Sequence, residues 1–306
     1  MKNDSLRNRV LAVLALILVV LALYALWARP FQLRWGATDS EVRRSMPGDQ
    51  LNLTPTFLAT RAITIQGTPG EIWPWIIQMG YGRAGFYGFD LFESVGSPTG
   101  ARSAERILPQ WQHFNVGDPV PISPVATLKF FAIEPDQYIV WSGEDGRHVF
   151  TWALYPVDAT HTRLVSRVRW TPQWTQPALL SLDLLTEFTD HLAVRKILQG
   201  LQGRVEGRPQ PANDVNIEFF IYLAAFLVFI WAALSVLRLP LSWASWLVGL
   251  AGGLTWLISW YAPGSIWLGA VLSLLVVWAV RVEFRDVQRL RLAQSAKEKP
   301  VLSKRR

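Results

Sequence analysis

Long uncharged apolar runs near the two ends of the chain constrain its fold more than any other feature. Residues 10–28 are nineteen residues without a charge, and between Phe219 and Val280 the only charged residue is Arg238. A helix rises about 1.5 Å per residue, so about 20 apolar residues cross the roughly 30 Å hydrocarbon core of a bilayer. The runs therefore predict membrane-spanning helices rather than buried helices of a soluble protein.

The apolar runs divide into four predicted spans, with one polar insert after the first. The uncharged stretch after Arg238 is long enough for two crossings, and the Pro-Gly turn in YAPGS at 261–265 separates them. The predicted segments are a basic N-terminus at 1–9, spans at 10–28, 219–237, 239–260 and 264–280, and a basic tail at 281–306.

Lys and Arg residues near the spans predict the orientation. The N-terminus, Arg238 and the tail all lie on one side of the membrane if there are four spans, and the positive-inside rule makes that side the cytoplasm. We therefore expect an integral protein of a bacterial cell membrane, with both termini cytoplasmic and the polar insert extracytoplasmic. Arg29 and Arg34 favour the opposite orientation weakly. The first span is interpreted as an uncleaved anchor, with a cleaved signal peptide as the alternative.

Charge and cysteine content exclude several classes of protein. The net charge of +7 comes largely from the tail, which favours anionic lipid headgroups over nucleic acid as a partner. The chain contains no cysteine, so disulfides and thiol chemistry are excluded.

The polar insert begins with a strand and a capped helix. TRAITIQG at 60–67 alternates like a strand. In TPGE, Thr68 and Glu71 have the spacing of a capping box and Pro69 suits the first helical position, which predicts a helix through IWPWIIQM.

Several strands and a helical region follow. Segments rich in Val, Ile, Thr and aromatic residues alternate with turns from about residue 115 to 170. In the last strand Arg163, Arg167 and Arg169 share one face, so we expect a sheet with one wet and one covered face. The apolar stripe of 178–205 changes phase, which predicts a helix break near Thr189 with Asp190 as an N-cap. This order indicates an α+β arrangement.

Stretches of the insert resemble the SRPBCC superfamily, the helix-grip proteins that include START lipid-transfer domains and polyketide cyclases. The matching stretches are WGATDSEVRRSMPGD at 35–49, TRAITIQGTPGEIWPWIIQMGYGRAGFYGFD at 60–90, SAERILPQWQHFNVGDPVP at 103–121, TWALYPVDATHTRLVSRVRW at 151–170 and RKILQGLQGRVEG at 195–207. The chain looks most similar to a bacterial branch of this superfamily. The resemblance implies a curved antiparallel sheet wrapped on a long C-terminal helix, with a hydrophobic cavity between them. We assign 60–207 to this domain and 29–59 to a linker.

The stretch MGYGRAGFYGFD at 79–90 is interpreted as the rim of that cavity, because its glycines permit tight turns and its rings need a surface to cover. Arg83 and Asp90 bracket AGFYGF, so a close loop could join them as a structural salt bridge. Alternatively, Arg83 presents donors to an anionic or carbonyl group of a ligand.

Aromatic rings and two charged residues make up the predicted ligand site. The candidates are Trp75, Arg83, Phe86, Tyr87, Phe89, Asp90, Trp111, Trp141 and Trp152. A pocket lined with rings and a few polar groups is typical of small-molecule sites, although each ring alone suits a core equally well. Glu93 and Glu105 have no partner at a recognisable spacing. The four histidines, His113, His148, His161 and His191, show no metal-binding spacing, so no catalytic residue, metal or cofactor is assigned.

Three functions remain open from the sequence. The first is a membrane-anchored domain that binds a hydrophobic small molecule or lipid, with the bilayer and that ligand as its partners. The second is an enzyme of the cyclase or hydratase type, which converging polar groups in the cavity would favour. The third is a membrane scaffold or sensor with a vestigial cavity, which a filled core would favour. The pattern favours binding over catalysis.

Overall fold

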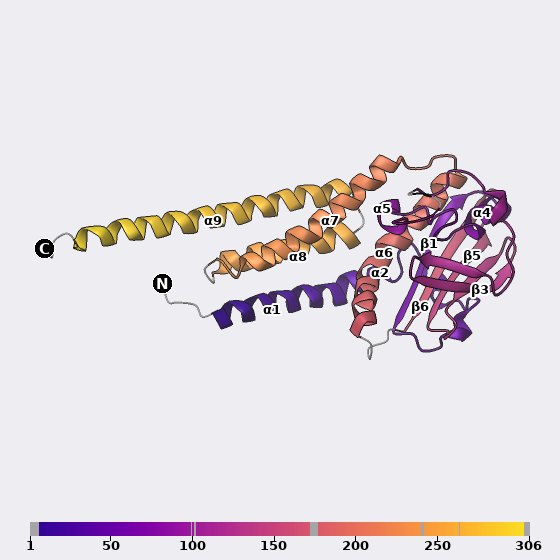
Figure 1. The fold of residues 1–306 in the computed structure, drawn as a ribbon, viewed down its shortest axis with the longest axis horizontal. Coiled ribbons are helices and arrows are strands. Elements are labelled where there is room, and N and C mark those ends of the chain that lie inside the picture. Colours follow the sequence, from indigo (N-terminus) through magenta and orange to yellow (C-terminus); the bar gives the residue numbers. More distant parts are fainter. Residues whose placement is uncertain are drawn as a thin grey trace. The chain divides into compact units, whose positions relative to one another are not determined.

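The chain forms two compact units, whose elements are labelled in Figure 1. The computed structural model describes residues 6–98, 100, 102–171, 177–239, 242–262 and 264–302. Residues Met1–Arg29 and Ile217–Arg306 form the helical unit, and Pro30–Asn216 form the sheet unit.

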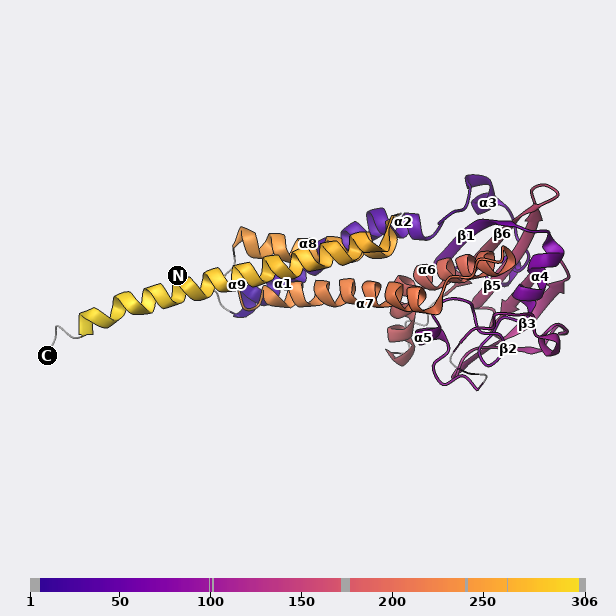
Figure 2. The same ribbon diagram turned by 90° about the horizontal axis from the view of Figure 1, so that it is seen from above.

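The sheet unit is built on one six-stranded antiparallel sheet, which confirms the α+β class and the predicted run of strands. The strand order is β1-β6-β5-β4-β3-β2, so the first strand along the chain pairs with the last. The strands are β1 (Phe57–Gln66), β2 (Pro119–Ser123), β3 (Ala126–Glu134), β4 (Tyr138–Ser142), β5 (His148–Pro156) and β6 (His161–Trp170). Helices α4 (Pro69–Ile77) and α6 (Pro177–Val205) contribute to one core with the sheet, and Figure 2 shows α6 running along the sheet.

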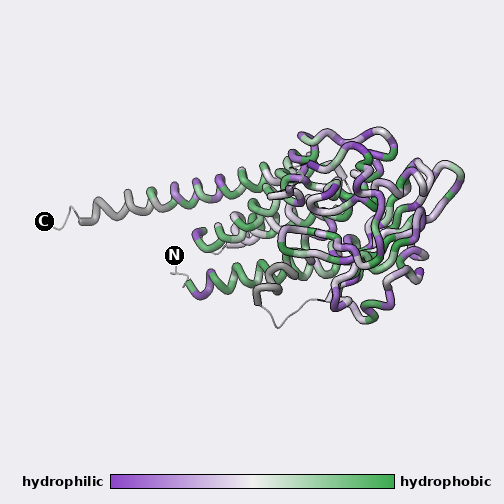
Figure 3. The backbone as a smooth tube through the Cα atoms, turned by 45° about the vertical axis from the view of Figure 1, so that its right-hand side comes forward, coloured by the Kyte–Doolittle hydropathy of each residue, from purple (hydrophilic) through white to green (hydrophobic). Residues whose placement is uncertain are grey.

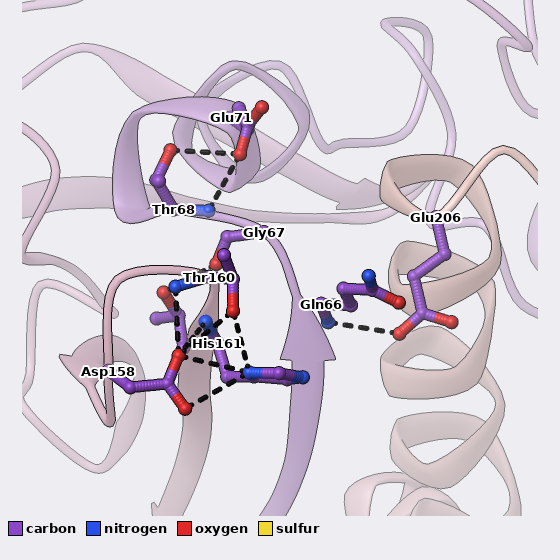
Figure 4. Close-up of polar contacts among 9 residues, drawn as sticks. Gln66, Gly67, Thr68, Glu71, Asp158, Thr160, His161 and Glu206 are labelled. Carbon is purple, nitrogen blue, oxygen red and sulfur yellow. Dashed lines mark hydrogen bonds and ion pairs between the residues drawn. The ribbon is translucent and has the colours of Figure 1, made fainter.

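The start of α4 follows the predicted capping box. The Glu71 carboxylate accepts hydrogen bonds from the Thr68 backbone N–H at 2.7 Å and from its hydroxyl at 2.9 Å (Figure 4). Close by, the backbone N–H of Gln66 donates to Glu206 at 3.0 Å, and Thr162 donates to the carbonyl of Gly67 at 2.7 Å. These bonds tie the end of β1 to β6 and to the end of α6.

Helix α6 is one continuous helix of 29 residues, so the predicted break near Thr189 is wrong. Asp190 does not cap a helix; it accepts a hydrogen bond from Arg61 of β1 at 2.5 Å, and both side chains are buried. The next residue, His191, lies edge-on to the rings of Phe31 and Trp35. The apolar stripe changes phase here because the helix contacts polar and aromatic neighbours before it reaches the sheet core.

The space between the sheet and α6 is a packed core among the described residues. Trp141 of β4 and Trp152 of β5 lie with their ring centroids 6.0 Å apart, and Phe130 of β3 packs edge-on to Trp141. Leu198 and Leu201 of α6 complete the same cluster. Full burial of such a side chain stabilises a fold by about 1.5–3 kcal/mol, so this cluster supplies much of the stability of the unit.

The other face of the sheet is covered over β5 and β6, so the predicted wet face is wrong there, whereas Lys129 and Phe131 of β3 are exposed on it. The segment expected to be a linker contains α2 (Arg29–Gln32), α3 (Asp39–Arg43) and the short 3-10 turn Asp49–Leu51. Arg167 of β6 lies beneath this segment and is 3% exposed. Its guanidinium donates to the carbonyls of Glu41, Val42 and Arg44 and to the side chains of Asp49 and Thr60.

Among the described residues, three helices are long and apolar enough to cross a membrane. These are Leu6–Gln32, Ala212–Ser235 and Ile266–Leu290. The first comprises α1 (Leu6–Leu23), a π-helical turn at Tyr24–Ala28 and α2; the others are α7 (Ala212–Ser235) and the first part of α9 (Ile266–Leu302). Figure 3 shows the hydrophobic stretches of these helices and the change to hydrophilic residues along α9. The helix thus continues beyond the predicted end of the last span.

The fourth predicted span is the helix α8 (Trp243–Tyr261), which is not among the three candidate spans. Its glycines lie at helix contacts inside the unit. A Cβ added to Gly252 would lie 2.7 Å from the Ala232 Cβ of α7, and a Cβ at Gly249 would lie 2.5 Å from Leu16 of α1. Trp256 stacks on Phe229 of α7, with ring centroids 5.4 Å apart. Gly249, Gly252 and Trp256 of α8 therefore face protein.

Candidate functional site

A cavity of about 240 Å³ lies in the sheet unit, between the loop of residues 87–105, α6 and the segment 209–216; we call it the α6 cavity. Its lining mixes charged, polar and apolar side chains. The lining residues are Tyr87, Gly88, Asp90, Leu91, Arg102, Ser103, Glu105, Lys196, Gln199, Gly200, Arg204, Pro209, Gln210, Ala212, Val215 and Asn216.

Ser103 holds the two ends of the loop together. Its hydroxyl accepts from the Tyr87 backbone N–H at 2.8 Å and donates to Asp90 at 2.6 Å, while its own backbone N–H donates to the other Asp90 oxygen at 2.9 Å. Tyr87 has a φ of 65°, a left-handed conformation that is uncommon for a residue with a Cβ. These bonds stabilise that conformation and fix the wall of the cavity.

Tyr87 lies directly against α6. A side chain at Gly200 would overlap the Tyr87 carbonyl, so only glycine permits this approach. The Tyr87 hydroxyl donates to the carbonyl of Trp75 at 3.0 Å and accepts from Gln78 at 2.8 Å. Burial raises the pKa of this hydroxyl above its usual range, so it stays protonated and serves as a fixed support.

Three cationic side chains reach the cavity. Lys196 is 3% exposed, and its Nζ donates to Gln210 at 2.6 Å. Arg204 donates to the carbonyls of Ala104 and Gly200 at 2.9 and 3.1 Å, and its guanidinium carbon lies 4.5 Å from the centre of the Tyr87 ring. Arg102 is exposed and makes no hydrogen bond or ion pair with the described residues. The cavity therefore combines two anchored cations with one that has no partner among the described residues.

Glu93 of α5 (Asp90–Glu93) lies behind the cavity wall. Both of its carboxyl oxygens are inaccessible to solvent, and a Cβ added to Gly88 would lie 2.5 Å from each of them. Burial raises the pKa of Glu93 to about 8, with a further contribution from the charge of Asp90 and an opposing one from Lys196. Glu93 is therefore largely protonated at neutral pH. The sequence alone gave it no partner, because Gly88 and Lys196 approach it only in the folded unit.

Arg83 and Asp90 do not form the predicted salt bridge. The backbone N–H groups of Gly80 and Gly85 each donate to the other residue's carbonyl at 3.1 Å, so the loop is as tight as expected. However, Asp90 binds Ser103, whereas Arg83 donates to the carbonyl of Pro119. The Arg83 guanidinium lies 4.2 Å from the centre of the Phe114 ring, and burial lowers the pKa of Arg83 to about 10.

The other predicted site residues lie in several places. Tyr87 and Asp90 line the α6 cavity, and the Phe89 ring lies 5.6 Å from Lys196 Nζ. Trp75 supports Tyr87 edge-on, with ring centroids 5.9 Å apart, and Trp111 lies 5.5 Å from the Arg83 guanidinium. Phe86, Trp141 and Trp152 belong to the packed core. Ligand binding by these nine residues remains a prediction.

The cavity residues on α6 were missed by sequence reasoning. Lys196, Gln199, Gly200 and Arg204 recur at intervals of three and four residues, so they share one face of the helix. A polar stripe of this kind usually faces solvent and gives no sign of a cavity. Gly200 inside an otherwise regular helix was the available signal, because such a glycine often marks a close approach of another backbone.

Comparison with known proteins gives distant structural likenesses only. No family model matches the chain, and no curated protein matches it. A polyketide cyclase-like protein from Corynebacterium glutamicum matches at 16% identity over 49% of this chain and 91% of that one, with a TM-score of 0.31. A conserved protein of unknown function from Enterococcus faecalis matches at 12% identity over 57% and 94%, with a TM-score of 0.27. Protein MLL2253 from Mesorhizobium loti matches at 16% identity over 50% and 100%, with a TM-score of 0.28. Likenesses of this size carry no argument about function.

Proposed function

We propose that this chain is a membrane-anchored binding protein of the helix-grip type, whose sheet unit takes a small molecule in the α6 cavity. The element order supports the helix-grip assignment: a strand, a capped helix, five further antiparallel strands and a long C-terminal helix. The sequence resemblance to the SRPBCC superfamily points in the same direction.

The helical unit supplies the membrane anchor, and we propose α8 as its fourth span. Three helices already have the length and composition to cross a bilayer. The glycines of α8 contact α1 and α7, as small residues do where membrane helices pack closely. Four spans and the basic residues at both chain ends support cytoplasmic termini and an extracytoplasmic sheet unit.

The observation that carries the binding function is an open cavity whose walls are held by specific bonds. Small-molecule pockets usually enclose about 300–1,000 Å³, so a cavity of about 240 Å³ suits a small molecule or one lipid headgroup rather than a whole lipid. The charged lining and the packed core beneath α6 favour a polar ligand at this place over an apolar ligand between sheet and helix.

A cavity-filling variant tests this function. We expect native mass spectrometry of the full chain, released from detergent, to show a bound small molecule. Val215→Trp places a large ring in the cavity and should remove that mass, whereas Val116→Trp, at an exposed position outside the cavity, should retain it. A parent protein without any bound molecule, or equal retention in both variants with unchanged melting temperatures, would contradict the proposal.

A further inference from the structure

We propose that the α6 cavity binds the phosphate group of its ligand, an inference that rests on the proposed function and names the class of ligand. The lining contains the cationic side chains Arg102, Lys196 and Arg204 and the acidic side chains Asp90 and Glu105. Cations thus outnumber acids, although the cavity lies well away in sequence from the basic tail that dominates the net charge.

The acidic side chains do not cancel the excess of positive charge in the cavity. Both oxygens of Asp90 accept hydrogen bonds from Ser103, at 2.6 and 2.9 Å. Glu105 is exposed, so water screens its charge. Glu93 behind the wall is uncharged at neutral pH for the reason given above. A ligand in the cavity therefore meets donors that outnumber its competing carboxylates.

The three cations approach the cavity from two sides and differ in how many of their hydrogen-bond donors the protein already uses. Lys196 and Arg204 are anchored on α6, and Arg204 uses only two of its five N–H donors in hydrogen bonds to the described protein. Arg102 comes from the opposite wall and donates no hydrogen bond to any described residue. A phosphate group offers several terminal oxygens, which suit a lysine point charge and arginine forks that approach from two sides.

Two sources supply this chemistry, a free phosphorylated molecule and the headgroup of an anionic phospholipid. A membrane-anchored protein has access to either. The two sources differ in one testable way, because a bound headgroup would compete with added phosphate only when anionic lipid surrounds the protein.

The test uses inorganic phosphate and the full chain in phosphatidylcholine nanodiscs, with the phosphorus-31 linewidth as readout. We expect broadening that saturates with protein concentration. Arg102→Gln and Lys196→Gln should each weaken binding about tenfold or more, the loss typical of one charge-assisted hydrogen bond. Arg106→Gln is the matched control, because it removes an exposed arginine that directly follows the loop and does not line the cavity, and it should leave binding unchanged.

Repeating the titration in nanodiscs that contain phosphatidylglycerol distinguishes the sources. Unchanged phosphate binding supports a free ligand, whereas phosphate binding that is weakened in proportion to the phosphatidylglycerol content supports a lipid headgroup that competes for the same cavity. Absence of saturable broadening in phosphatidylcholine, or equal losses in Arg102→Gln and Arg106→Gln, would overturn the phosphate assignment. If native mass spectrometry still finds an uncharged molecule that Val215→Trp removes, the binding function stands and only its ligand class is wrong.

Discussion

Two arginine-rich regions of the sheet unit use the same side chain for opposite purposes. On the outer face of the sheet, all five N–H groups of Arg167 donate hydrogen bonds to protein acceptors, and its side chain is almost fully buried. In the α6 cavity, Arg204 donates two hydrogen bonds to the described protein and Arg102 donates none. A cation with every donor satisfied stabilises a fold, whereas cations with donors left over around a cavity are available to a ligand.

This comparison shows that the strand or helix face on which an arginine lies does not reveal its role. In β6 the alternation that places Arg163, Arg167 and Arg169 together predicts solvent exposure, yet residues 35–52 cover that face. The count of satisfied donors separates structural from available cations, and it is visible only in the folded unit.

The largest expected effect comes from removing Arg167. Arg167→Met removes the donors of three backbone carbonyls and one of the cations beside Asp49, and loss of one partner from a buried ion pair destabilises a protein by about 3–5 kcal/mol. The melting temperature of the full chain in detergent should fall by roughly 10 °C. Arg34→Met removes an exposed ion pair with Asp39 and should change it by little. Equal shifts for the two variants would show that Arg167 is not the organiser of this face.

A smaller loss of stability should follow a change at the contact between α6 and the loop. Gly200→Ala forces a methyl group into the Tyr87 carbonyl, and overpacking of this kind costs about 1–3 kcal/mol in the free energy of unfolding. Gly70→Ala in α4 is the control, because its methyl group would make only an ordinary contact with Asp136 at 3.9 Å and alanine favours a helix. Denaturant titrations should show the first variant destabilised and the second neutral or stabilised. A neutral Gly200→Ala would mean that the loop does not rest on α6.

A third effect concerns Glu93 and appears only in the pH dependence of stability. Its pKa is about 8 in the folded protein against an ordinary value of 4.5, so the folded state holds the proton more tightly. The stabilising contribution of the protonated acid is complete below pH 4.5 and is lost as the pH rises towards 8.

Glu93→Gln keeps the shape of the protonated acid and cannot ionise. The variant should match the parent near pH 4.5 and become more stable than the parent at pH 8 and above, as thermal melts across this range would show. Parallel melting curves for parent and variant at every pH would place the Glu93 carboxyl in water rather than behind Gly88.

Local sequence signals predicted the elements of the sheet unit well. The Thr68–Glu71 capping box, the start of α4 and the alternating strands all depend on neighbours in sequence. The apolar runs likewise predicted the helices of the helical unit, and three of them meet the length and composition of a membrane span.

The features that the sequence did not predict depend on contacts between segments that are far apart in the chain. Asp190 sits in a polar interruption of the apolar stripe and was interpreted as a cap, because its partner Arg61 lies 129 residues away in the chain. The α6 cavity is formed by three segments between residues 87 and 216, and its polar stripe on α6 has the pattern of an ordinary solvated face. The predicted site relied on aromatic residues, and several of these proved to be core.

An experimental structure of the full chain, purified without added ligand, tests the central claim most directly. If the α6 cavity is the binding site, we expect density for a non-protein molecule there, in contact with Lys196 or Arg204, and no such density between the sheet and α6. Density for a ligand among Trp141 and Trp152 beneath α6, with only water in the α6 cavity, would contradict binding in the α6 cavity. The binding site would then lie between the sheet and α6, as the sequence predicted.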